Sequence, residues 1–215
     1  MADQMTKNRI IVAGIGPGNP AYMVPEAMKA IEDAAVLVGG KRALSQFAKA
    51  ARTQETMAVG GDIPAVLDFI AGKLPEHDVV VMVSGDPGYY SLLDALRRKF
   101  PVEAIKVIPG ISSLQLAFAK LALPWHDADL LSFHGRVPSD ARLEYAAGRL
   151  LGMLTDSKYN SHTIARLLMD KGWPDNAEMA ICSRLSYEDE SIARTTLGQA
   201  ENLPVQGNCV LVVRG

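Results

Sequence analysis

Four short polar segments, each following a run of apolar residues, hold the residue types that could bind a ligand or carry out chemistry. The first reads GIGPGNP at residues 14–20. It has the G-x-G start of a dinucleotide-binding loop, but Asn19 stands where the third glycine would be. Pro17 and Pro20 also lack the backbone N–H groups that a phosphate cradle uses. The segment therefore predicts a tight turn that lets a ligand or another chain segment approach the backbone.

The second segment reads SGDPGYYS at residues 84–91 and follows a continuous apolar run. Two interpretations of Asp86 stay open. Asp-Pro-Gly is ordinary turn chemistry, and an aspartate there can simply begin a helix. Two glycines, an acid and two tyrosines at the end of a strand also suit a small-molecule pocket.

The third and fourth segments lie in the middle of the chain and read PGISS at residues 109–113 and SFHGR at residues 132–136. Ser112 or Ser113 could cap the helical pattern that follows, or offer a hydroxyl to a ligand. His134 stands beside a glycine and Arg136 at the end of an apolar run. An ordinary hydrogen-bonded histidine explains His134 as well as a functional one does.

Composition argues against several classes of function. The net charge is -2 without a dense basic cluster, so nothing favours nucleic-acid binding. The chain has no G-x-S-x-G motif and no metal-spaced set among its 4 His and 2 Cys. Hydrolase and metalloenzyme interpretations therefore lose support, and we expect no protein-bound metal. Cys182 and Cys209 are expected to be reduced thiols.

The start of the sequence and its longest apolar runs predict the location of the protein. The first residues, MADQMTKNRI, lack the apolar stretch of a signal peptide. No apolar run approaches the roughly 20 residues that a membrane helix needs. We therefore expect a cytoplasmic protein that does not associate with a membrane.

The polar segments are positioned by an alternation of β-branched apolar runs and helical patterns. In the first half this pattern predicts strands at residues 9–13, 35–38, 78–83 and 104–108, and helices at residues 22–34, 41–49, 63–72 and 91–99. Asp62 is expected to cap the third helix, with Pro64 in its first turn. Strands separated by helices indicate a mainly parallel sheet with helices on both sides.

The pattern begins again after Pro109. It predicts helices at residues 112–121, 140–151 and 161–171, and strands at residues 130–133, 152–155, 178–183, 191–197 and 209–213. The last three strands have no helices between them, which indicates a mixed sheet. The sequence thus predicts an α/β fold with two domains, residues 1–110 and 111–215.

Taken together and in this order, the polar segments resemble the tetrapyrrole (corrin/porphyrin) methylase family. The resemblance runs from Ile10 to Val213 and rests on GIGPG at 14–18, SGDPGYYS at 84–91 and IPGISS at 108–113. Further segments resemble the branch that methylates cobalt-precorrin-7 at C5, the CbiE type. They are VGGKRAL at 38–44, SSLQLAFAKLALPWHDA at 112–128, SFHGR at 132–136 and LTDS at 154–157. One departure is KYNSH at 158–162, where relatives often carry a proline before the helix.

This resemblance implies an S-adenosylmethionine-dependent methyltransferase of cobalamin biosynthesis. It also implies a methyl donor in a cleft between two α/β domains, and a homodimer. The chain resembles the stand-alone enzyme, so a separate C15-methylating, decarboxylating methyltransferase would be its functional partner. The positions that correspond to donor contacts are Pro17, Ser84, Gly85, Asp86, Tyr89, Ser112, Ser113, Leu154, Thr155, Asp156, Arg184 and Leu185.

The implied substrate is a corrin ring with many carboxylates, which cations should hold by charge-assisted hydrogen bonds. Candidates are Lys41, Arg42, His134 and Arg136, with Gly16 close to the ring. Lys41 and Arg42 could equally be solvated residues at a helix start. Methyl transfer needs mainly correct placement of the reacting atoms, so no essential Cys, Ser or metal is expected. His134, a substrate carboxylate or water could take the final proton.

Other functions remain as alternatives. A tetrapyrrole methylase acting at another ring position would keep the donor loops and differ at residues 38–44 and 132–136. A superfamily member could methylate RNA or a modified histidine, although the absence of a basic face counts against RNA. From different classes, an NAD(P)-dependent oxidoreductase or a non-catalytic ligand-binding module is possible. Donor binding separates the methylases from the last two.

Overall fold

The computed structural model describes residues 8–48 and 54–215. The chain forms two compact units, Met1–Ser112 and Ser113–Gly215. Most of the predicted strands and helices are present. The helix predicted for residues 41–49 ends at Phe47, and its last predicted residue lies outside the described residues.

The first unit is built on a five-stranded sheet in which all neighbouring strands are parallel. The strand order is β3-β2-β4-β1-β5. The strands are β1 (Ile10–Gly14), β2 (Val36–Gly39), β3 (Glu55–Ala58), β4 (Val79–Val83) and β5 (Ile105–Ile108). The expectation of a mainly parallel first sheet is therefore confirmed. β3 was not expected, because the sequence ETMA gives an edge strand without an apolar run.

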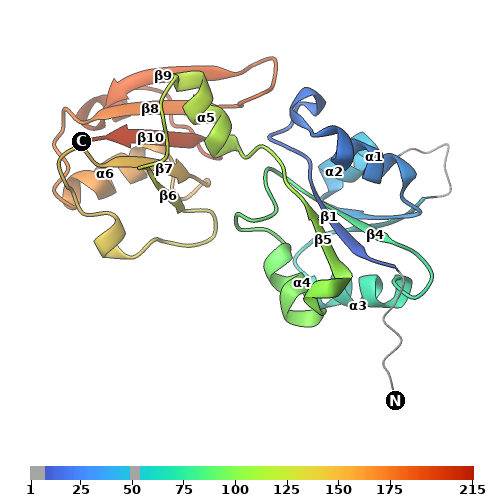
Figure 1. Ribbon diagram of the computed structural model, residues 1–215. Helices are drawn as coiled ribbons and strands as arrows, with labels where there is room; N and C mark the ends of the chain where they lie inside the picture. Colours follow the sequence, from blue (N-terminus) through green and yellow to red (C-terminus); the bar gives the residue numbers. More distant parts are fainter. Residues whose placement is uncertain (1–7, 49–53) are drawn as a thin grey trace. The chain divides into compact units, whose positions relative to one another are not determined.

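Helices cover both faces of this sheet (Figure 1). They are α1 (Pro25–Asp33), α2 (Lys41–Phe47), α3 (Ile63–Lys73) and α4 (Leu93–Lys99), with 3₁₀ turns at Pro20–Tyr22 and Val102–Ala104. On one face α3 and α4 pack through side chains such as Ile70 and Leu96. On the other, α1 and α2 pack through side chains such as Ile31 and Ala43. Asp62 caps α3 as expected, because its carboxylate accepts the Ala65 N–H.

The second unit has a mixed sheet, as expected, with the order β6-β7-β10-β8-β9. β6 and β7 are parallel, and the other neighbours are antiparallel. The strands are β6 (Asp129–Ser132), β7 (Leu150–Leu154), β8 (Glu178–Ser183), β9 (Ser191–Thr196) and β10 (Val210–Arg214).

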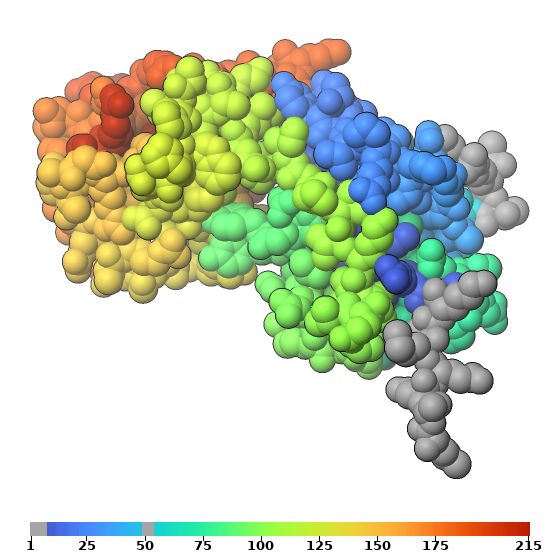
Figure 2. Space-filling view, in the orientation of Figure 1, coloured from blue at the N-terminus to red at the C-terminus, as the bar shows by residue number. Residues whose placement is uncertain are grey.

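Two helices cover opposite faces of this second sheet. α6 (Ser161–Asp170) and the 3₁₀ turns Leu197–Asn202 and Asp140–Arg142 lie at the larger apolar core, which includes Met153, Ile181 and Leu211. α5 (Ser113–Leu121) packs on the other face, where the Phe118 ring lies so close to Gly152 that a Cβ there would be 2.7 Å from it. The C-terminal residues, red in Figure 2, lie at the surface beside the yellow-green segment that follows α5.

The prediction of a helix at residues 140–151 is wrong. Only a 3₁₀ turn forms there, and β7 already begins at Leu150. The Leu143 carbonyl accepts the Trp173 indole N–H at 2.8 Å and so is bonded outside any helix. Gly148 has a φ of 76°, which a right-handed helix cannot contain.

Both cysteines are free and buried. Burial raises the pKa of the Cys182 thiol to about 12. A thiolate nucleophile is therefore disfavoured at that position near neutral pH. Within residues 8–48 and 54–215, no helix is long and apolar enough to cross a membrane.

Candidate functional site

Three of the four polar segments converge because they follow three neighbouring strands. β4, β1 and β5 lie side by side and run parallel, so their carboxyl ends share one edge of the sheet. The loops at residues 14–18, 84–91 and 109–113 leave from these ends. Ligands of open α/β sheets bind at this edge.

The three loops touch through glycine backbones. A Cβ placed on Gly14 would be 2.7 Å from Gly110 Cα and 2.7 Å from the Gly85 carbonyl oxygen. A Cβ on Gly110 would clash with the same carbonyl. These distances are shorter than real carbon contacts, so the close approach requires glycine at these positions. The loop edge is therefore a packed arrangement of backbones.

Backbone hydrogen bonds fix the first two loops to each other. Gly85 donates its N–H to the Gly16 carbonyl at 2.8 Å, and Ile15 donates to the Val83 carbonyl at 2.9 Å. Gly16 has a φ of 73° and Gly85 a φ of 70°, both in the left-handed region that favours glycine.

The Asp86 carboxylate joins the second loop to the third. Its Oδ1 accepts the Gly88 N–H at 2.8 Å, and its Oδ2 accepts the Gly110 N–H at 3.0 Å. Asp86 is thus a turn residue that also reaches a segment 24 residues away. Next to it, the Tyr89 and Tyr90 rings meet edge to face with centroids 4.7 Å apart. Tyr90 has a φ of 50°, which few non-glycine residues adopt.

A pocket of about 380 Å³ opens beside the first loop. It brings together Gly16, Lys41, Arg42 and Ser84, which the sequence assigned to substrate or donor. The sequence analysis missed Gln46, which also lines the pocket and donates to the Gly18 carbonyl at 3.4 Å. Its position one helical turn after Arg42 was the available signal.

In the second unit, the fourth polar segment follows β6 and the LTDS segment follows β7. These strands are parallel neighbours, so the two loops leave from the same sheet edge. The Phe133 N–H bonds to the Leu154 carbonyl at 2.8 Å, and the Gly135 N–H bonds to the Asp156 carboxylate at 3.2 Å. His134 and Arg136 both lie exposed on this loop.

Two other residues assigned to the donor are tied to their own unit. The Thr155 hydroxyl is buried, accepts the Cys209 N–H at 2.8 Å and lies 2.9 Å from the Cys209 carbonyl. The Arg184 guanidinium forms an ion pair with Asp189 at 2.8 Å. This pair raises the pKa of Arg184 and lowers that of Asp189. Arg184 also stacks on the Tyr187 ring, 4.6 Å from its centroid.

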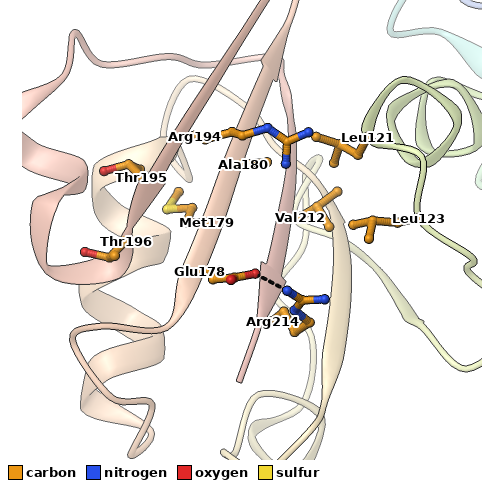
Figure 3. Close-up of a pocket in the computed structure, with 10 residues that line it drawn as sticks. All are labelled: Leu121, Leu123, Glu178, Met179, Ala180, Arg194, Thr195, Thr196, Val212 and Arg214. Atoms are coloured by element: carbon orange, nitrogen blue, oxygen red, sulfur yellow. Dashed lines mark hydrogen bonds and ion pairs between the residues drawn. The ribbon is translucent and has the colours of Figure 1, made fainter.

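Another pocket, of about 490 Å³, lies on the second sheet and contains none of the expected residues (Figure 3). Leu121, Leu123, Ala180 and Val212 give it an apolar lining. Glu178 and Arg214 form an ion pair at its edge, 2.5 Å apart. In the described part of the chain, no group of three or more His, Cys, Asp or Glu side chains is placed to hold a metal ion.

Comparison with known proteins decides the family. The family described as Tetrapyrrole (Corrin/Porphyrin) Methylases matches residues 9–201. The chain belongs to the tetrapyrrole methylase family. This confirms the resemblance that the ordered loops indicated.

Among the relatives of this tetrapyrrole methylase is the cobalt-precorrin-7 C(5)-methyltransferase of Salmonella typhimurium. The two are 35% identical over 204 residues, which cover 95% of this chain and 98% of that protein. The fold is shared with the cobalt precorrin-4 methyltransferase CbiF, at a TM-score of 0.79 and 18% identity, over 96% of this chain and 94% of that one. It is also shared with the Thermus thermophilus uroporphyrin-III C-methyltransferase in complex with S-adenosylhomocysteine. That match has a TM-score of 0.71 and 19% identity, over 96% of this chain and 92% of that one.

Proposed function

We propose that this protein transfers the methyl group of S-adenosylmethionine to C5 of cobalt-precorrin-7 in cobalamin biosynthesis. The observation that carries the proposal is the match along 95% of the chain to a relative of that name. A methylase of another ring position would be expected to differ at residues 38–44 and 132–136.

The first loop suits a methyl donor better than a nucleotide phosphate. The donor has an adenosine and an amino acid but no phosphate, so it does not need the N–H groups that Pro17 and Pro20 lack. The packed glycines leave little room between the loops, and the Ser84 side chain lines the adjoining pocket. We assign Pro17, Ser84, Gly85, Asp86, Tyr89, Ser112 and Ser113 of the first unit, and Leu154, Thr155, Asp156, Arg184 and Leu185 of the second, as donor contacts.

Recognition of the corrin is assigned to the cations. Lys41 and Arg42 line the pocket that also contains Gly16 and Ser84, which supports a role for them at the ring carboxylates. His134 and Arg136 are exposed on a loop whose backbone is hydrogen-bonded, so the loop presents both side chains at the surface. Charge-assisted bonds from such groups are roughly twice as strong as neutral ones.

Methyl transfer requires little covalent chemistry from the protein. The bound donor supplies a methyl group on a sulfonium, a good leaving group for in-line attack by an electron-rich ring carbon. The new C–C bond forms as the C–S bond breaks, and a proton then leaves the ring. The residues of this chain would need mainly to hold the methyl group and the ring carbon in line, at roughly 3–3.5 Å. His134 is the side chain that we assign to proton acceptance.

We further propose a cytoplasmic homodimer that acts next to a separate C15-methylating, decarboxylating methyltransferase. These proposals rest on the family resemblance, and the match to a relative named for C(5) methylation alone supports a separate C15-methylating enzyme. Light scattering at micromolar concentration should give twice the 23.1 kDa of one chain. A monomer mass alone would contradict the dimer.

The test is incubation of cobalt-precorrin-7 with the protein and isotope-labelled donor, followed by mass spectrometry. Transfer of one labelled methyl group supports the proposal. Binding of S-adenosylhomocysteine without transfer to any corrin would leave a ligand-binding module. Saturable micromolar binding of NAD, NADP or ATP would instead revive an oxidoreductase or nucleotide-binding function.

A further inference from the structure

The Asp156 carboxylate connects two loops of the second unit. Its Oδ1 accepts the N–H groups of Lys158 at 2.9 Å and Tyr159 at 2.6 Å, which closes a turn within its own loop. Its Oδ2 accepts the N–H of Gly135, 21 residues earlier in the chain. Asp156 therefore joins the loop after β7 to the loop after β6.

The loop after β6 is the one that carries His134 and Arg136. It leaves the core at Ser132 and Phe133, which are buried, and then becomes exposed. The Ser132 hydroxyl accepts the His134 N–H at 3.3 Å, and Asp156 accepts the next N–H, that of Gly135. The backbone on both sides of the His134 side chain is thus fixed by a side-chain acceptor.

The ionisation of the Asp156 carboxyl strengthens the hydrogen bonds that connect the two loops. The hydrogen bond from the Tyr159 backbone, then that from Gly135, hold the pKa of its carboxyl below the usual range, with smaller contributions from the Lys158 backbone and the charge of His134. The group is therefore ionised at neutral pH, and hydrogen bonds to an ionised acceptor are stronger than neutral ones. Three of its roughly four lone-pair sites are occupied by backbone of the same unit.

We propose that Asp156 is a positioning residue for the corrin. Its carboxylate fixes the loop that presents His134 and Arg136, and so determines where these side chains meet the ring carboxylates. The carboxylate serves this loop, and the donor contact that we assign to Asp156 is made through its backbone. This inference rests on the proposed function.

The test compares Asp156→Ala with Asp78→Ala. Asp78 is a matched control, because its carboxylate also joins two distant segments by accepting a backbone N–H, that of Arg9 at 2.7 Å. It precedes β4 and so lies at the opposite sheet edge from the loops of the first unit. The measurements are the KM and kcat for cobalt-precorrin-7, the Kd for S-adenosylhomocysteine, and the hydrogen-exchange rate of the Gly135 amide.

For Asp156→Ala, we expect the KM for the corrin to rise about tenfold and the Kd for S-adenosylhomocysteine to change less than about twofold. The Gly135 amide should exchange faster, because it has lost its acceptor. Asp78→Ala should leave all of these values unchanged, although it also removes an acceptor between distant segments. An intermediate effect is expected for Asp156→Asn, since one of its two terminal atoms still accepts hydrogen bonds.

Two results would overturn the inference. Donor affinity that falls as much as corrin affinity would make Asp156 a donor ligand, and an unchanged KM would remove it from substrate positioning. If the unaltered protein does not methylate cobalt-precorrin-7, the proposed function fails instead. The Gly135 exchange rate still decides the structural part in that case, since unchanged exchange in Asp156→Ala contradicts it.

Discussion

The two units hold their loops by different means. In the first, Gly14, Gly85 and Gly110 bring three backbones into direct contact, so the shape of the loops depends on the absence of side chains. In the second, a Cβ on Gly135 would meet nothing within 4 Å, and the loop is held by the Asp156 carboxylate. Added bulk should therefore damage the first region and not the second, whereas loss of the aspartate acceptor, Asp86 or Asp156, should affect both.

The largest expected effect is the difference in stability and donor binding between two glycine substitutions. Gly110→Ala should cost about 2 kcal/mol or more in the free energy of unfolding, because the new methyl group clashes with the Gly85 carbonyl. It should also abolish binding of S-adenosylhomocysteine at millimolar concentration. Gly135→Ala places its methyl group in open space, although the φ of 68° costs about 1–2 kcal/mol. Calorimetric titration and chemical denaturation of both variants test the contrast.

In that experiment, Gly135→Ala should bind S-adenosylhomocysteine as the unaltered protein does. If the two substitutions weaken donor binding equally, the glycine contacts of the first unit have no special role. Gly72→Ala in α3 is a further control, because a Cβ there also meets nothing within 4 Å and alanine favours a helix.

The next effect concerns Asp86. Asp86→Ala removes the acceptor for the N–H groups of Gly88 and Gly110, and so releases the third loop from the second. We expect donor affinity to fall about tenfold while the free energy of unfolding falls by less than about 1 kcal/mol. Calorimetric binding and denaturation of the same variant measure both. Intact binding with a loss of about 1 kcal/mol or more would leave Asp86 as a turn residue only.

A smaller effect is expected at Arg136. Arg136→Ala should raise the KM for the corrin several-fold and leave kcat and donor affinity nearly unchanged, because it removes a contact made equally in the ground and transition states. Steady-state kinetics with varied corrin measure this. Unchanged corrin kinetics would show that Arg136 does not belong to the site. That result would also contradict the proposed role of Asp156 in positioning Arg136.

The smallest effect is on acid stability. The pKa of Asp156 is lowered from its ordinary value of 3.8, so its ionised form stabilises the folded state. That contribution is fully present above the unfolded pKa and is lost as the pH falls through the folded one. Thermal unfolding of Asp156→Asn and the unaltered protein should therefore differ most near pH 7 and converge below about pH 4. A gap that persists or widens in acid would contradict this.

Sequence patterns predicted the elements but not the contacts between them. The apolar run of β8 gave its bounds, Glu178–Ser183, and strand-end loops were expected to bind ligands. The packing of Gly14, Gly85 and Gly110 has no local signal, because it depends on β4, β1 and β5 being neighbours. The bonds of the two aspartates to glycines 24 and 21 residues away are equally non-local.

Non-local contacts also explain the wrong helix prediction at residues 140–151. Their apolar spacing favours a helix, but Trp173, 30 residues later, takes the Leu143 carbonyl, and Leu143 itself is buried in the core of the second unit. A tertiary partner thus overrode the local preference. β3 is the opposite case, because an edge strand is formed by pairing with β2 without strong propensity of its own.

The central claim is methyl transfer to one carbon of a corrin. The most direct measurement is carbon NMR of cobalt-precorrin-7 after incubation with the protein and donor labelled with ¹³C in its methyl group. The account predicts a single new labelled methyl resonance, whose methyl protons show a long-range correlation to ring carbon C5. Label at another ring carbon would contradict the C5 assignment and favour a methylase of a different step. No label in any corrin, with S-adenosylhomocysteine bound, would contradict the enzymatic function itself.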